Sequence, residues 1–583
     1  MSQFEEQFRD EVIIRRLCKV RIKDASSRHK RLFHRQINSD VPMPALPEML
    51  DLFPPRRQWN RFRNRIRRKN SDEDQNLTAL LRATINLRTE FPNAPWVQRL
   101  NERIQSIRQR ALEQATFAFN PPTIRAEEKS PASNEFRAIA KFSVDDQVIE
   151  GITASYFRHT FDQLFTDSSL AFRCARDGSP PPTHHGAVTL IENYRKRHLG
   201  TGLYVAECDI KGFFDCVSHK VAANTLTNLV DEAVEQNPGF VVDPRALQIF
   251  QAYLECYSFP ENVTSLAELS LKVEKGQEAR YKWPEEALRE FHADPRSARI
   301  GIPQGGALSC FIANCVLHQA DLEVKRSRSR TPGPFRYLRY CDDMVILAPS
   351  LETCRISFEV YQQSLQRLLL PAHQPIEVAA YDAEFWNGKS RQPYLWAQPG
   401  SGNTVPWLQF VGYQIRYDGT LRVKKKSVAK HKAKILQETN RLLRTLNPTR
   451  PAGSSPPIFA LGIRKTASQI IHRFRQKLTA MSVGRRAVHH NLRQAMPQCW
   501  ATGFKMVRGR RIPINAFKEL DRFRERQIER VWRRLRHLPV SAKPNTSNVG
   551  FRAPGFYGFP FSYVAQFAPA GRPKTGRMPA RRR

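Results

Sequence analysis

Three aspartates stand at the ends of short apolar runs, and their setting points to metal-dependent phosphoryl transfer. Asp209 follows the run LYVAEC, and Asp342 and Asp343 lie between the β-prone runs RYLRY and MVIL. Acids at the ends of apolar strands are costly to bury unless a cation binds them. Carboxylate oxygens suit Mg²⁺, with Mn²⁺ as the alternative. Two such ions held about 4 Å apart can activate an attacking hydroxyl and stabilise a departing oxygen.

The elements around these acids must hold them rigidly, because in-line transfer tolerates little geometric error. The relevant segments are YVAECDIKGFFD at 204–215, the glycine-rich GIPQGGALS at 301–309 and YLRYCDDMVIL at 337–347. From about 135 to 425, short β-branched or aromatic runs alternate with longer helical stretches. This mixture predicts an α+β fold with antiparallel hairpins.

In this order the three segments resemble motifs A, B and C of reverse transcriptases, the last being the Tyr-x-Asp-Asp box. The segment LQFVGYQIRYDG at 408–419 resembles the hairpin after the palm in group II intron and retron enzymes, and FRAIAKFSVDDQVIE at 136–150 and SLAFRC at 169–174 resemble their fingers motifs. The resemblance covers roughly residues 130–430. It implies a right-hand polymerase with α+β fingers and palm, a helical thumb and basic helical N- and C-terminal regions.

The resemblance also implies which residues hold the metal and the primer. Asp209 and Asp342 would be the metal ligands, with Asp343 as the third acid and Ile210 lending its backbone carbonyl. The alternative is that the acids cap turns. Tyr340 would pack near the primer end.

Around the sugar and base of the nucleotide, the resemblance assigns further positions. Phe214 would be the steric gate that excludes a ribose 2′-hydroxyl, unless Phe213 and Phe214 both serve the core. Gln304 and the Gly305 backbone would contact the incoming nucleotide or the template, because glycine permits close approach. The alternative is an ordinary loop leading into a helix.

Three cations would bind the triphosphate. Arg137 aligns with a fingers arginine that clamps the phosphates, a task suited to a forked cation. Arg173 follows similar logic. Lys389 would be the general acid for the departing pyrophosphate. The alternatives are surface arginines and a solvated lysine.

Charge along the 583 residues indicates a polyanionic partner. The formal net charge is +38, distributed as +11 over residues 1–110, −6 over 111–420 and +33 over 421–583. A near-neutral centre flanked by basic segments is typical of a catalytic core with nucleic-acid-binding arms. The ten cysteines form no CxxC pair, no apolar run approaches 18 residues, and the N-terminus lacks signal-peptide features. We therefore expect a cytoplasmic protein without a membrane span, disulfide framework or zinc ribbon.

Composition and the resemblance together predict five parts. They are a basic helical extension (1–120), the fingers and start of the palm (121–208), the palm (209–425) with an insertion at about 218–300, a basic helical thumb and C-terminal domain (426–540), and an aromatic and then basic disordered tail (541–583).

Within reverse transcriptases, the chain most resembles the bacterial defence-associated class, the unknown-group and abortive-infection-like enzymes. This implies an RNA-directed DNA polymerase in antiphage defence that uses dNTPs, makes DNA and works with a structured noncoding RNA as template or scaffold. The alternatives are a group II intron or CRISPR-associated enzyme, template-independent homopolymer synthesis, and a catalytically silent maturase-like RNA-binding protein. A homo-oligomer is possible, and the RNA, the priming mode and the activation trigger stay open.

Overall fold

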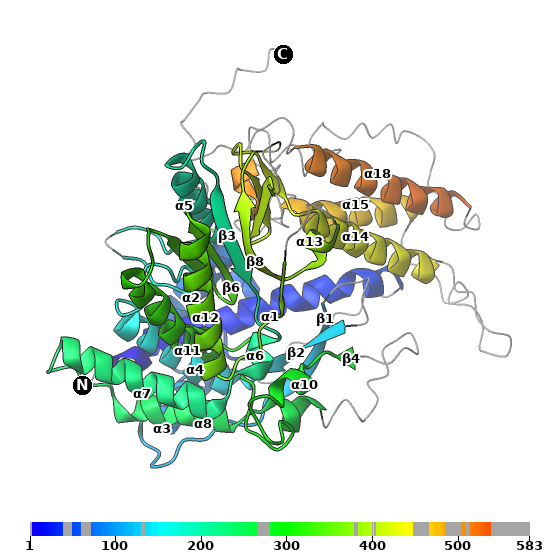
Figure 1. Cartoon of the computed structure of the whole chain (residues 1–583). Helices are drawn as coiled ribbons and strands as arrows, with labels where there is room; N and C mark the ends of the chain where they lie inside the picture. Colours follow the sequence, from blue (N-terminus) through cyan, green and yellow to red (C-terminus); the bar gives the residue numbers. More distant parts are fainter. Residues whose placement is uncertain are drawn as a thin grey trace.

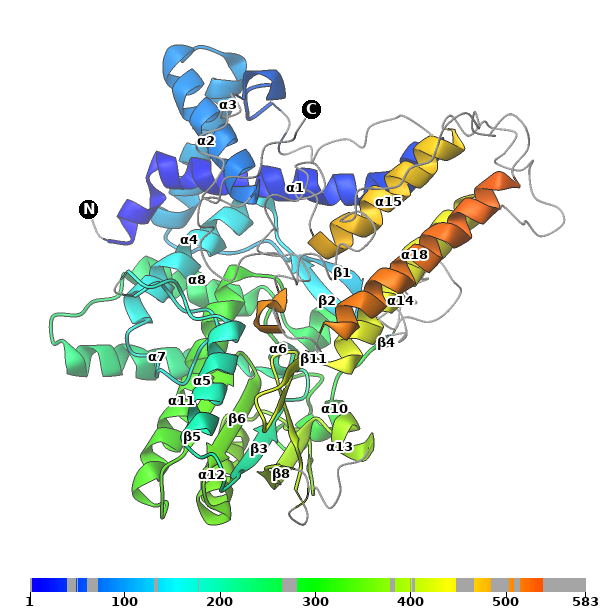
Figure 2. The same ribbon diagram turned by 90° about the horizontal axis from the view of Figure 1, so that it is seen from above.

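The computed structural model is organised around a central mixed sheet with helices on both faces (Figures 1 and 2). The residues that it describes are 3–38, 49, 51–59, 72–129, 135–176, 178–264, 280–377, 383–398, 400, 404–446, 466–483, 503–507 and 514–537. The predicted α+β fold class is confirmed, whereas the predicted tail at 541–583 lies outside the described residues.

The central sheet has the strand order β5-β6-β3-β8-β7. Its strands are β3 (Leu203–Cys208), β5 (Arg336–Tyr340), β6 (Asp343–Ala348), β7 (Pro375–Ile376) and β8 (Ser390–Trp396). All neighbours are antiparallel except β7 and β8. Antiparallel pairing through hairpins agrees with the expectation from the sequence.

Strict alternation along these strands divides the sheet between two apolar clusters. Ala206 and Ile346 belong to the first cluster, and Val205, Leu338 and Val345 to the second. Successive side chains of a strand point to opposite faces, so β3, β5 and β6 each contribute to both clusters. The continuous apolar runs in the sequence reflect this two-sided burial.

The first cluster unites the N-terminal helices with those beside the sheet. It draws on α1 (Asp10–Asn38), α2 (Asp72–Glu90), α3 (Pro95–Leu112), α4 (Val144–Phe161), α7 (His219–Gln236), α8 (Pro244–Glu255), α11 (Ala307–Arg326) and α12 (Leu351–Arg367). Ser143 and Ser350 cap α4 and α12 by accepting backbone N–H bonds from Asp146 and Thr353. The described residues of the predicted extension (1–120) and of the predicted insertion (about 218–300) thus share one core with the sheet.

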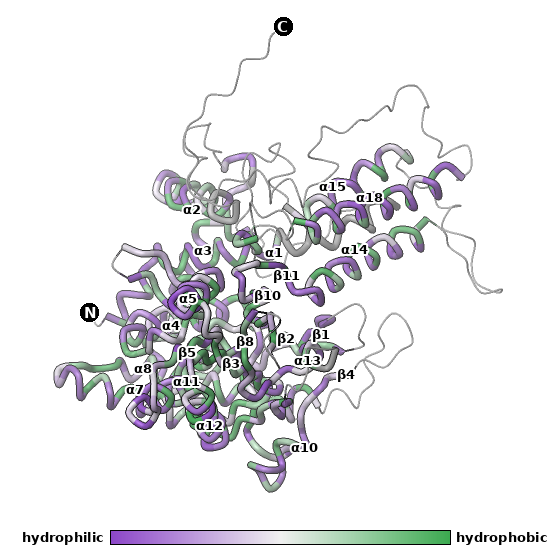
Figure 3. The backbone as a smooth tube through the Cα atoms, turned by 45° about the horizontal axis from the view of Figure 1, so that its top comes forward, coloured by the Kyte–Doolittle hydropathy of each residue, from purple (hydrophilic) through white to green (hydrophobic). Residues whose placement is uncertain are grey.

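The second cluster joins the other face of the sheet to a small sheet and a three-helix bundle. Its elements are α5 (His184–Lys196), the meander β9 (Trp407–Phe410), β10 (Tyr413–Arg416) and β11 (Leu421–Val423), and the bundle α14 (Lys425–Leu446), α15 (Ala467–Val483) and α18 (Asn515–Arg536). Apolar and hydrophilic positions alternate along the bundle helices (Figure 3), as expected for helices with one buried face.

A third sheet, β1-β2-β4, lies beside the bundle. Its strands are β1 (Thr123–Glu128), β2 (Glu135–Lys141) and β4 (Arg280–Tyr281), and three short helices, α6 (Phe213–Cys216), α10 (Glu285–Leu288) and α13 (Ala383–Asn387), complete the connections. The Gln437 amide of α14 donates to Glu128 Oε2 of β1 at 2.6 Å. This bond links the β1–β2 hairpin to the bundle.

In the part of the chain that the structure describes, none of the helices combines the length and apolar composition needed to cross a bilayer.

Candidate active site

The three predicted acids meet at one end of the central sheet. Asp209 follows the last residue of β3, and Asp342 occupies the turn between β5 and β6. Cys208 of β3 pairs with Met344 of β6, so the next step of the antiparallel register brings Asp209 opposite Asp343. Residues that face each other across antiparallel strands have Cβ atoms about 5 Å apart. Asp209 and Asp343, 134 positions apart in the chain, are thereby made neighbours.

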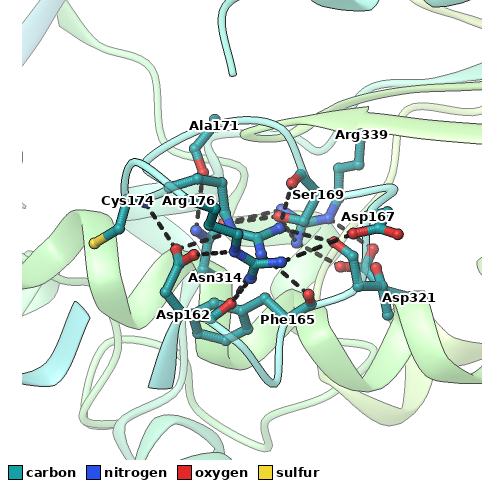
Figure 4. A network of polar contacts seen from close by, with 12 residues as sticks. Asp162, Phe165, Asp167, Ser169, Ala171, Cys174, Arg176, Asn314, Asp321 and Arg339 are labelled. Carbon is teal, nitrogen blue, oxygen red and sulfur yellow. Dashed lines mark hydrogen bonds and ion pairs between the residues drawn. The ribbon is translucent and has the colours of Figure 1, made fainter. Parts of the chain in front are cut away.

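A buried polar network supports the hairpin turn that carries Asp342 (Figure 4). Cys341, the first turn residue, has φ = 61°, a conformation that costs a non-glycine residue about 1–3 kcal/mol. Its carbonyl accepts a 3.0 Å bond from Arg339, whose guanidinium also forms a bidentate pair with Asp321 at 2.8 and 2.6 Å. Both members of the pair are fully buried. The network therefore holds the strained turn in place.

Electrostatic repulsion among the carboxylates favours a bound cation. Burial, followed by the charge of Asp209, raises the pKa of Asp342. Asp343 is exposed at the start of β6, yet desolvation by the surrounding protein, followed by the charges of Asp342 and Asp209, raises its pKa to about 7. A hard cation at this end of the sheet would relieve that repulsion.

Lys389 already contacts one of the acids. Lys389, between α13 and β8, donates to Asp209 Oδ2 at 2.9 Å and approaches His373 Nε2 at 3.1 Å. His373 also donates its backbone N–H to the Asp209 carbonyl at 3.0 Å. Burial, followed by the charge of Lys389, lowers the pKa of His373 to about 4. The structure thus brings the predicted general acid to the carboxylates.

The Gln304 side chain is fixed by an acid that follows the proposed gate. The side-chain Nε2 of Gln304 donates to Asp215 Oδ1 at 2.7 Å, and the backbone carbonyl of Gln304 accepts from the backbone N–H of Ala140 at 2.9 Å. Burial raises the pKa of Asp215 to about 7. Gly305 has φ = +108°, and a Cβ there would lie 3.3 Å from Ile139 Cγ2, so glycine fits this turn for two reasons.

The two phenylalanines of α6 have separate roles. Phe213 is buried, whereas Phe214 is only partly buried, and their rings meet edge to face at 5.4 Å. The Phe214 carbonyl accepts a 2.8 Å bond from Ile302, which ties it to the glycine-rich segment. Phe213 lies within the first apolar cluster, and Phe214 packs against that cluster while staying partly exposed, so its role as a gate stays a prediction.

The other predicted contacts divide between the site and its support. Arg137 is exposed on β2 and interacts electrostatically with Asp215, so it lies on the Gln304 side of the site. Tyr340 is half-buried and packs against the second apolar cluster, and its ring lies edge to face with the ring of His184, with the ring centroids 6.2 Å apart. Ile210 buries its side chain and forms an isolated β-bridge with Ala372.

Arg173 does not reach the site, and its placement argues against the predicted phosphate contact. The side chain is buried, and its five N–H groups all donate within the protein. The acceptors are Asp162 Oδ1 and the backbone oxygens of Asp162, Phe165, Thr166 and Ser169, at 2.7–3.1 Å. Arg173 braces the loop beside the Arg339 network, a role that a local motif match does not reveal.

The acids have the chemistry of a Mg²⁺ site without a preformed cage. Within the described ranges, no group of three or more His, Cys, Asp or Glu is close enough together to hold a metal ion. The donor set of Asp209, Asp342 and Asp343 nevertheless consists of hard oxygens that repel one another and already attract Lys389. These residues fit a hard divalent cation completed by substrate oxygens.

Two residues at the site were missed by the sequence reasoning. His373 follows a helix in LLLPAHQP, where no spacing links it to Asp209. Lys424, at the start of the run KKK, is mostly buried and interacts electrostatically with Asp343. The sequence signal that could have identified Lys424 is its position at the start of the basic run that follows the 408–419 hairpin.

The chain shows only limited similarity to known proteins. No protein-family model matches the sequence, and no curated protein matches it significantly. Among solved structures, apo telomerase from Candida tropicalis is 10% identical over 86% of this chain and 80% of its own, with a TM-score of 0.35. Telomerase from Candida albicans in complex with a TWJ fragment of telomeric RNA is 12% identical over 80% and 73%, with a TM-score of 0.28. At such scores the site is interpreted from the chain's own geometry.

Proposed function

We propose that this chain is an RNA-directed DNA polymerase that adds deoxynucleotides to a 3′-hydroxyl. The observation that carries the proposal is the convergence of Asp209, Asp342 and Asp343 at one end of a sheet, with Lys389 on Asp209. Gln304 and Arg137 both lie close to Asp215, and Phe214 is bonded to the glycine-rich segment, so these three residues would contact the base, the phosphates and the sugar of a nucleotide. The fingers, palm and thumb of a right-hand polymerase are the corresponding interpretation of the fold.

In this proposal the three aspartates would hold Mg²⁺, which lowers the pKa of the primer hydroxyl and neutralises the phosphates. Arg137 would orient the triphosphate. Lys389, which donates to Asp209 in the structure, would give a proton to the departing pyrophosphate. Gln304, with its amide N–H₂ bonded to Asp215, would present its carbonyl oxygen to the base pair.

We further propose a structured noncoding RNA as template or scaffold, and antiphage defence as the setting. The charge of +33 over residues 421–583 supports a polyanionic partner. The defence role depends on the resemblance in sequence to defence-associated reverse transcriptases.

Sequencing of the nucleic acid that co-purifies with the full chain tests this function. The wild type is expected to carry one defined RNA and complementary DNA, and the D342A/D343A variant the same RNA without DNA. Homopolymer DNA in the wild type would favour untemplated synthesis. RNA without DNA in both proteins, from infected as well as uninfected cells, would favour a maturase-like role and contradict the proposal.

Phe214→Ala is expected to relax sugar selection. Loss of the ring would open the space in which a 2′-hydroxyl is excluded, so the preference for dNTPs over rNTPs, measured as kcat/KM, should fall about 100-fold. Leu229→Ala, a buried substitution in α7 away from the acids, is the control for general destabilisation. An unchanged ratio in the Phe214 variant would exclude the gate.

A further inference from the structure

The outward face of α18 carries a continuous row of cations. Lys518, Arg522, Arg526, Arg530, Arg533 and Arg536 are all exposed. At 3.6 residues per turn these six positions fall within about 120° of the helix circumference and extend along about 27 Å. We call these six residues the α18 basic face.

The opposite side of α18 is fixed against the bundle. Phe517, Leu520, Ile528, Val531 and Leu535 are buried in the second apolar cluster. Buried Arg524 also donates to Thr479 Oγ1 of α15 at 2.6 Å. The helix cannot rotate to hide its cations without giving up this packing.

The α18 basic face lies away from the candidate active site. The helix facing the β1–β2 hairpin is α14, through the Gln437–Glu128 bond and the electrostatic proximity of Lys430 to Arg137. Figure 1 shows α14 between that hairpin and α18. A nucleic acid that reaches the acids past β2 and α14 would leave the α18 basic face free.

Two exposed acids, Glu519 and Glu529, share this face and offset part of its charge, and Arg530 also donates to Asn440 Oδ1 of α14 at 3.0 Å, so the six cations still leave an excess of positive charge. Glu519 is bonded to Lys432 of α14, and Glu529 to Arg533 at 3.2 Å. Two of the guanidiniums lie over half-buried aromatic rings, Arg526 over Phe523 at 5.7 Å and Arg536 over Trp532 at 5.2 Å. Stacking of this kind orients an arginine and leaves its N–H groups directed outward.

We propose that the α18 basic face is a second RNA-binding surface, which holds a structured RNA outside the path to the active site. Five of its six cations are arginines, whose forked donors match phosphate oxygens. An anionic membrane is disfavoured, because interfacial helices bury an apolar face in lipid and the apolar face of α18 is already buried in protein. The inference deepens the proposed function by locating the RNA partner, but RNA binding here does not depend on polymerisation.

The test is RNA binding by the full chain without dNTPs, over a range of salt concentrations. The probe is a labelled RNA stem-loop, compared with a DNA stem-loop of the same sequence. The K518Q/R522Q/R526Q variant keeps good helix-forming residues at exposed sites. Its RNA affinity is expected to fall about tenfold or more, and the slope of log affinity against log salt should become shallower by about three units.

A matched variant removes three exposed cations elsewhere, K196Q/K325Q/R330Q, and should bind RNA as the wild type does. Primer extension on a short primer–template should be similar in all three proteins. Equal loss of RNA binding in both variants would show that only the net charge of the protein matters, and would contradict a binding surface on α18. Unchanged RNA binding in the α18 variant, binding of phosphatidylserine vesicles in preference to RNA, or a loss of extension as large as the loss of RNA binding would overturn the proposal.

If the chain lacked polymerase activity, the RNA-binding results would still decide the inference. Conversely, an active polymerase whose α18 variant binds the stem-loop normally would refute this surface and leave the proposed function intact.

Discussion

Asp209→Asn is expected to lower the rate of nucleotide incorporation by about 10³-fold or more while the protein stays folded. The substitution removes the negative charge that Asp209 would offer a metal, but the amide oxygen can still accept a bond from Lys389. The Asp209 side chain is mostly buried, at 20% exposed, and a neutral amide costs less to desolvate there than a carboxylate does. Single-nucleotide incorporation with Mg²⁺ and thermal unfolding, measured on the same preparation, check both parts.

Asp167→Asn is the matched control, because this aspartate side chain is 98% exposed. It should incorporate nucleotides at the wild-type rate. An Asp209→Asn protein that retained more than about a tenth of wild-type activity would show that Asp209 is not a required ligand. Retained RNA binding in the inactive variant would separate catalysis from partner recognition.

Arg339→Met is expected to reduce the free energy of unfolding by about 3–5 kcal/mol, the largest stability effect we predict. It leaves the Asp321 carboxylate buried without its bidentate partner, and among the residues that the structure describes only Tyr337 Oη still donates to it, at 2.7 Å. It also removes the bond to the Cys341 carbonyl, so the turn carrying Asp342 loses support. Denaturant unfolding of the full chain is the measurement.

Two further variants distinguish this mechanism from general sensitivity to mutation. Asp321→Asn in the Arg339→Met background removes the stranded charge and should recover part of the stability. Arg355→Met breaks an exposed pair with Glu352 on α12 and should cost at most about 1 kcal/mol. Comparable losses for Arg339→Met and Arg355→Met would contradict the role of the network.

The parts of the site predictable from sequence are those where chemistry and local structure coincide. Asp209, Asp342 and Asp343 each stand at the end of a β-prone run, and antiparallel pairing is enough to bring two such ends together. Gln304 and Gly305 belong to a segment whose glycines already indicate a special backbone. The local sequence pattern around each of these residues was therefore enough to predict its position.

The misplaced and missed residues depend on tertiary contacts. Arg173 has the residue type of a phosphate ligand, but carbonyls of the 162–169 loop surround it, and no spacing encodes that loop's path. Arg339 follows the alternation of β5, yet its partner Asp321 comes from α11, 18 residues earlier. His373 reaches Asp209 only because residues 371–373 run beside 209–211.

The double-faced burial of the central sheet has a consequence for how the molecule opens. Loss of α5 and the β9–β11 meander would bare Val205, Leu338 and Val345, and loss of α12 would bare Ala206 and Ile346. Neither half can melt without stripping one side of the same strands, so the two halves form a single cooperative unit there. Backbone amides of β3 and β6 should accordingly be the slowest in the chain to exchange with deuterium. The aspartates are therefore anchored in the strands that unfold last.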